Sequence, residues 1–69
     1  MSRIWEAKNN VAKLKLLIEE DENVGFYLIV YPLGSAESIK DHLCDDFEEA
    51  LLEAFESYGV QKDIWTQTI

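Results

Sequence analysis

The sequence predicts a small α+β fold: an antiparallel β-meander of three or four strands with one carboxyl-terminal amphipathic helix packed on one face. Two observations predict it. Two segments in the first half, residues 12–19 and 26–32, have the alternation or β-branched and aromatic content of strands, and residues 46–58 have helical periodicity. The chain has 69 residues, so we expect a single domain over residues 1–69.

The helix is the clearest element, because apolar residues recur at the i, i+3, i+4, i+7 spacing that makes one buried stripe. Asp46 and Glu49 form a capping box at its start, and Gly59 follows its last apolar residue. The stripe residues are Phe47, Ala50, Leu51, Ala54, Phe55 and Tyr58. The outward positions are then glutamates, namely Glu48, Glu49, Glu53 and Glu56.

Two strands precede the helix and form a hairpin. Residues 26–32 read as a strand that ends at Pro32, and residues 12–19 alternate apolar with mostly polar side chains. A helix is the alternative for the amino-terminal half, since its apolar residues also fit a heptad. We favour strands, because Asn9-Asn10 suits a tight turn and a lone strand at Phe26 would need partners.

Three shorter elements complete the prediction. With a turn at Asn9-Asn10, residues 3–7 become a further short strand. Residues 38–44 are expected to form an irregular edge strand that runs into the helix. In the tail, residues 61–69, we expect Trp65 to fold back onto the helix end or the sheet, because an exposed tryptophan wastes apolar area.

The central strand is apolar on both sides, and this feature carries the functional prediction. Phe26, Leu28 and Val30 point one way, while Tyr27, Ile29 and Tyr31 point the other way. One helix covers only one side. Tyr27, Ile29 and Tyr31, joined by Leu17 from the neighbouring strand, are then left for another surface.

We therefore expect a non-enzymatic protein-interaction module that binds a protein or itself, most simply as a homodimer, through this aromatic sheet face. An alternative is that Trp5 and the amino-terminal segment wrap over the same face inside one monomer.

Charge excludes some partners and suggests a second function. Fourteen acids against six bases give a formal net charge of −8, which repels nucleic acid and anionic lipid surfaces. The acidic helix face formed by Glu48, Glu53 and Glu56 could instead dock on a basic protein, as an acidic inhibitor, immunity protein or antitoxin would. The same face is also a common way to keep a small protein in solution.

The chain has few groups for chemistry. His42 and Cys44 lie on one side of an extended segment, but one histidine and one cysteine are too few for a zinc site. Asp45 and Asp46 disfavour a Cys44 thiolate. No phosphate-binding loop or nucleophile signature is present, so we expect no catalytic or metal-binding residues, no cofactor and no small-molecule substrate.

Cysteine content and hydropathy indicate the compartment. A single cysteine excludes an internal disulfide framework and fits a reducing, cytoplasmic setting. The longest apolar run, residues 26–33, is too short to span a membrane.

Two stretches resemble known proteins. The acidic turn and strand over residues 20–30, with the helix start over residues 45–50, is similar to the hairpin and helix start of HicB-like antitoxin domains. The pattern from Asp46-Phe47 through Tyr58-Gly59-Val60 to Trp65 resembles short uncharacterised bacterial proteins, of cyanobacterial type. The second resemblance implies a fold and no activity, and neither carries over a catalytic or binding residue.

Overall fold

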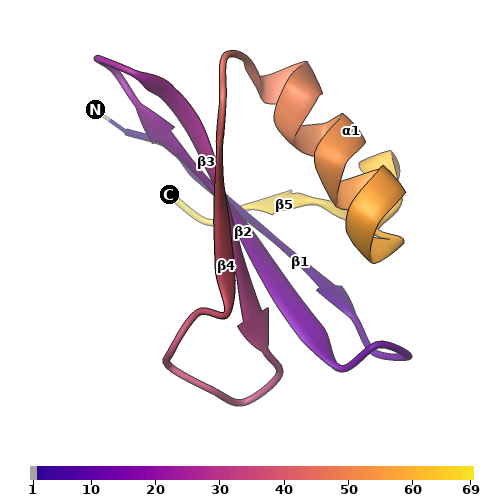
Figure 1. Ribbon diagram of the computed structural model, residues 1–69. Helices are drawn as coiled ribbons and strands as arrows, with labels where there is room; N and C mark the ends of the chain where they lie inside the picture. The colour runs from indigo at the N-terminus through magenta and orange to yellow at the C-terminus, as the bar shows by residue number, and fades with distance from the viewer. Residues whose placement is uncertain (1) are drawn as a thin grey trace.

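The chain forms an antiparallel sheet of five strands with one helix across one face, which confirms the α+β prediction (Figure 1). The computed structural model describes residues 2–69. Its elements, in chain order, are β1 Ile4–Asn9, β2 Leu14–Asp21, β3 Gly25–Pro32, β4 Lys40–Cys44, α1 Phe47–Tyr58, the 3₁₀ turn η1 Lys62–Ile64 and β5 Thr66–Gln67.

The strand order is β4-β3-β2-β1-β5. The first four strands form the meander expected from the sequence, each beside the previous one. The fifth was not expected: the tail returns past the helix, and Thr66 and Gln67 pair with Glu6 and Trp5 at the free edge of β1. The sheet therefore has five strands instead of three or four.

The amino-terminal half is strand, as the alternation predicted, and not a heptad helix. Leu16 and Ile18 are fully buried, whereas Leu17 between them points to the other side of the sheet. The turn before β2 is held by Asn9, whose Oδ1 accepts a hydrogen bond from the Ala12 N–H at 3.1 Å. The asparagine pair thus ends β1 and lets β2 fold back.

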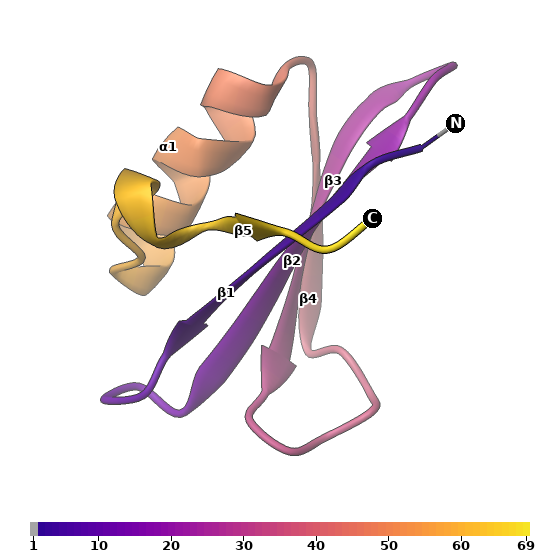
Figure 2. The same cartoon turned by 180° about the vertical axis from the view of Figure 1, so that it is seen from behind.

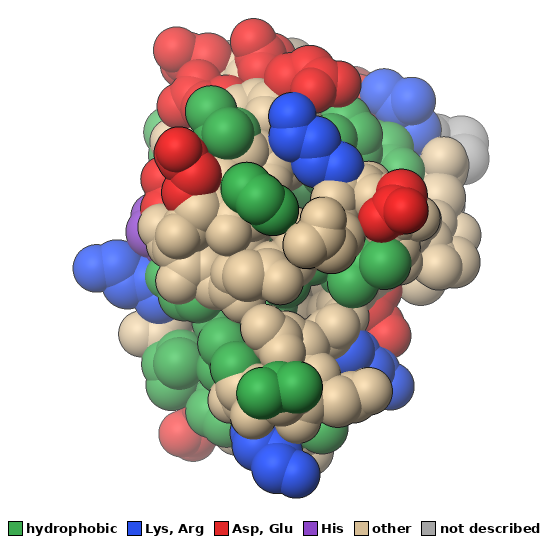
Figure 3. All heavy atoms as spheres, turned by 90° about the vertical axis from the view of Figure 1, so that its right-hand side faces the viewer, with side chains coloured by type: hydrophobic (Ala, Val, Ile, Leu, Met, Phe, Trp, Pro, Cys, Tyr) green, Lys and Arg blue, Asp and Glu red, His purple; other side chains and the backbone are tan. Residues whose placement is uncertain are grey.

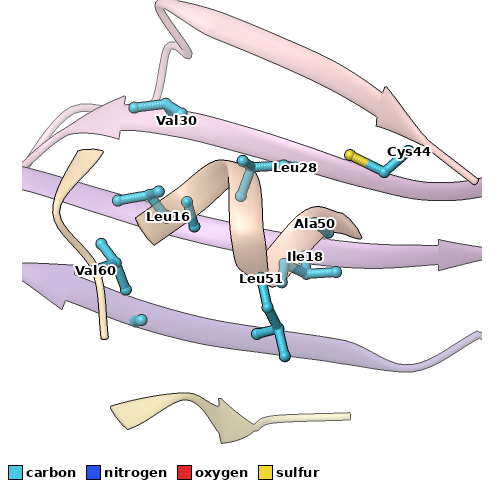
Figure 4. Packing of buried hydrophobic residues seen from close by; sticks show 10 residues of the cluster. Leu16, Ile18, Leu28, Val30, Cys44, Ala50, Leu51 and Val60 are labelled. Carbon is cyan, nitrogen blue, oxygen red and sulfur yellow. The ribbon is translucent and has the colours of Figure 1, made fainter. Parts of the chain in front are cut away.

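The core lies between α1 and one face of the sheet (Figure 4). Alanines at positions 50 and 54 of the helix are fully buried, and their small side chains let the helix lie close to β2 and β3. The buried residues are Ala7, Leu16, Ile18, Leu28, Val30, Cys44, Ala50, Leu51, Ala54 and Val60.

An aromatic cluster extends this core. The Trp5 ring lies 4.4 Å from the ring of Phe47 and 6.3 Å from that of Phe26, measured between centroids. Trp65 also packs against the core, as expected for the tail. Phe55 differs from its prediction, since it is 43% exposed although it belongs to the helical stripe. The apolar stripe of the helix is therefore wider than the part of the sheet against which α1 packs, and Phe55 lies outside that contact.

Both ends of α1 are capped as the sequence predicted. The Asp46 carboxylate accepts from the Glu49 N–H at 2.8 Å, and Glu49 reaches back to the N–H of Asp45. At the other end Gly59 adopts a left-handed conformation and its N–H donates to the Phe55 carbonyl. Asn9 adds a bond to the Tyr58 carbonyl at 2.8 Å, which ties the helix end to β1.

We predict that Gly25→Ala destabilises the fold. Gly25 opens β3 at φ +132°, and an added Cβ would lie 2.4 Å from the carbonyl oxygen of Cys44. Backbone strain and this clash should together lower the free energy of unfolding by roughly 2 kcal/mol or more, measured by urea denaturation.

Gly34→Ala is the matched control, because Gly34 also has a positive φ but nothing lies within 4 Å of an added Cβ. Its loss should be clearly smaller than that of Gly25→Ala. Equal losses would show that the close approach of β4 to Gly25 does not matter.

Candidate functional site

The candidate site is the sheet face that α1 does not cover. In both views the helix lies on one side of the sheet, and in the part of the chain described, residues 2–69, no helix or strand lies over the other side (Figures 1 and 2). We call this side the open face. It consists of three rows of cross-strand partners: Leu43, Tyr27, Glu19 and Ile4; Asp41, Ile29, Leu17 and Glu6; Tyr31, Lys15 and Lys8.

The residues predicted for this face lie together on it. Leu17 and Ile29 are direct cross-strand partners at its centre. Tyr27 and Tyr31 flank Ile29 along β3, and all four side chains are half-buried. The alternation of side chains along β3 determines which of its residues lie on the open face. Leu28 and Val30 point the other way and are fully buried under the helix.

Leu43 belongs to the same patch and was missed by the sequence reasoning. It pairs with Tyr27 across β3 and β4 and is 55% exposed. The alternation of residues 38–44 contained the signal, but the register of β4 against β3 was needed to place Leu43 on this side.

The alternative in which Trp5 covers the open face is wrong. Trp5 alternates with Glu6 along β1 and its ring lies in the cluster with Phe26 and Phe47, on the helix side. The open face therefore keeps its apolar centre uncovered within residues 2–69.

Charged residues surround the apolar patch. Lys15 lies with its Nζ 5.1 Å from the centroid of the Tyr31 ring, within range of a cation–π contact. Glu19 lies four residues further along β2, at the other end of the face, and Glu6 and Asp41 lie on either side of the central pair. An apolar centre with a charged rim is the usual anatomy of a protein interface.

The acidic helix face is less continuous than the sequence suggested. Glu48 and Glu56 are exposed, but Glu53 is half-buried and accepts a hydrogen bond from the Ser57 hydroxyl. Leu52, 45% exposed, lies between Glu48 and Glu56 on the helix surface. On this side of the molecule the acidic side chains gather mainly at the upper end, where α1 begins, and the others lie apart from one another (Figure 3).

His42 and Cys44 lie on the helix side of β4, where both have structural contacts. The His42 Nε2 lies 2.8 Å from the Tyr58 hydroxyl, a hydrogen bond that joins β4 to the last turn of α1. Burial, and then the charge of Glu53, raise the pKa of Tyr58. Burial is also the first cause that raises the pKa of the Cys44 thiol, ahead of Glu49, Glu53, Asp45 and Asp46. The predicted effect of the two aspartates is therefore present but secondary.

Ligand-binding features are few. Among residues 2–69 no group of three histidine, cysteine or acidic side chains could hold a metal ion. A hollow of about 460 Å³ lies beside the β2–β3 turn, lined by Glu19, Glu20, Asp21 and Tyr27 among others. Its carboxylates would repel phosphates and other anions. No helix in the described part of the chain has the length and apolar character needed to cross a bilayer.

No protein-family model, curated protein or solved structure matches this chain. The resemblances to HicB-like antitoxin domains and to short bacterial proteins stay predictions.

We predict that Cys44 is protected from thiol reagents in the folded protein. Its side chain is 3% exposed and its raised pKa lowers the fraction of reactive thiolate. The rate of labelling by a chromogenic disulfide reagent should rise about a hundredfold or more in denaturant. Fast labelling of the native protein would contradict the burial of Cys44.

Proposed function

We propose that this protein is a small, non-enzymatic interaction module that self-associates through the open face. The observation that carries the proposal is the uncovered patch of Tyr27, Ile29 and Tyr31 with Leu17 and Leu43. A sheet that faces water normally places polar side chains at such positions. Here β3 places only apolar ones.

The edges of the sheet support a face-to-face contact over edge-to-edge pairing. β5 has two residues, and β4 has five with Lys40 and Asp41 among them. Short and charged edge strands hinder the addition of another strand. The open face has no comparable protection at its centre.

The area of the open face determines how tightly the dimer is expected to bind. With about 4.8 Å between strands and about 3.3 Å per residue, five strands give a face of roughly 20 Å by 20 Å. This area of about 400 Å² is half of what each partner contributes to a standard interface, roughly 800 Å². We therefore expect a reversible dimer with a dissociation constant of roughly micromolar order.

The other parts of the molecule support a binding role without catalysis in a reducing, cytoplasmic compartment. Cys44 is a buried free thiol and His42 is hydrogen-bonded to Tyr58. Neither side chain faces the hollow beside the β2–β3 turn, which is lined by other residues.

The second candidate function is an acidic inhibitor, immunity protein or antitoxin. It is supported by the absence of lysine and arginine from α1, whose first turn carries Glu48 and Glu49. The exposed Leu52 and Phe55 interrupt its acidic surface, which favours the open face as the functional one. Binding through the acidic face would weaken steeply with salt, whereas an aromatic contact would not.

We predict that Tyr31→Glu dissociates the dimer. The new carboxylate would lie in the apolar patch and would have to be desolvated on binding, so the dissociation constant should rise about a hundredfold, measured by analytical ultracentrifugation. Circular dichroism would check that the variant folds, which is expected because Tyr31 is only half-buried.

Leu52→Glu is the matched control, since it places the same charge at an exposed apolar position on the helix side. It should leave the association unchanged. A wild-type protein that stays monomeric at high concentration, or a dimer weakened only by Leu52→Glu, would refute the proposed interface.

A further inference from the structure

We infer that the open face binds a second copy of this chain turned end over end, so that the two β3 strands cross antiparallel and Lys15 of each copy faces Glu19 of the other. This inference rests on the proposed function and specifies its geometry. It follows from the positions of charged and aromatic residues on β2 and β3.

The charged residues of β2 and the tyrosines of β3 are arranged around the same point of the open face. On β2, Lys15 and Glu19 lie two residues before and after Leu17. On β3, Tyr27 and Tyr31 lie two residues before and after Ile29. Because Leu17 and Ile29 are direct cross-strand partners, one line through this pair passes through the middle of both patterns.

A two-fold axis along this line makes the face complementary to itself. It leaves Ile29 opposite its own copy. It places Tyr27 against Tyr31 and Lys15 against Glu19, and each of these two contacts occurs twice. Symmetric dimers require this property, because the same patch serves both partners. The strands would then cross at the angle of about −30° that is typical of stacked sheets.

An axis parallel to the strands lacks this complementarity. It would keep the two ends of the face in register, so the end with Lys8 and Lys15 would lie on the same end of the other copy. Glu19 would then lie opposite Tyr27 of the other copy, and Lys15 opposite Tyr31. Neither charge would meet an opposite charge there, and the like-charged ends of the two copies would lie together, so the end-over-end arrangement is favoured.

The arrangement also has a cost that can be measured. Glu6 and Asp41 lie in the same row as Leu17 and Ile29, on its two outer sides, so each approaches its own copy. Neutralising both, as Glu6→Gln with Asp41→Asn, should therefore tighten the dimer.

Charge reversal tests the inference. Lys15→Glu alone leaves carboxylates facing Glu19, and Glu19→Lys alone leaves lysines facing Lys15. Each variant should raise the dimer dissociation constant about tenfold or more in analytical ultracentrifugation. An equimolar mixture restores both opposite pairs, so its heterodimer should bind about as tightly as the wild type.

Cross-linking tests the geometry independently of affinity. In a Cys44→Ala background, Tyr27→Cys and Tyr31→Cys should cross-link through a short bismaleimide when the two variants are mixed. Neither should cross-link efficiently alone, because like positions lie four residues, about 13 Å, apart along the sheet. Circular dichroism would verify that each variant folds.

The outcomes separate the two proposals. Restored binding in the mixture and cross-linking only between unlike positions would support the inference. A wild-type dimer that is insensitive to Lys15→Glu, or in which Tyr27→Cys cross-links to itself, would overturn the arrangement and leave the proposed function standing. A monomeric wild type would overturn both.

Discussion

The packing of α1 against one face of the sheet determines the rest of this structure. Ala50 and Ala54 bring the helix close to β2 and β3, where Leu16, Ile18, Leu28 and Val30 are fully buried. A single helix of twelve residues cannot also cover the opposite side. Since β3 is apolar on both sides, the uncovered patch is a direct result of how few elements the chain has.

Much of the fold could be predicted because local signals agreed. Alternation placed β2, composition placed β3, and the caps Asp46 and Gly59 fixed the limits of α1. β5 could not be predicted, because Thr66 and Gln67 have no pattern of their own and become a strand only by pairing with β1. Such pairing joins segments some sixty residues apart, and no short stretch of sequence indicates it.

The candidate site could be predicted in part. The period of two along β3 sufficed to separate Tyr27, Ile29 and Tyr31 from the core, whichever side the helix took. Leu43 and the position of Trp5 depended on register and on tertiary packing: Trp5 belongs to the helix side because Phe47, at the start of α1, contacts it. The complementary placement of Lys15 and Glu19 acquires meaning only once Leu17 is known to pair with Ile29.

The distribution of charge on the open face favours a reversible contact. It is not what is expected of a face that another layer of structure would bury permanently. On the helix side, which is permanently buried, the fully buried positions of β2 and β3 are all apolar. On the open face β1 and β2 keep charged residues. The apolar side chains lie mainly on β3 and at its immediate neighbours Leu17 and Leu43, and Ile4 on β1 is separated from them by Glu19. Such a face can meet water when the copies separate, because its rim stays solvated, and it still favours contact at its centre. A chain of net charge −8 thus places a nearly balanced set of charges, two lysines and three acids, on the surface that would meet its own copy.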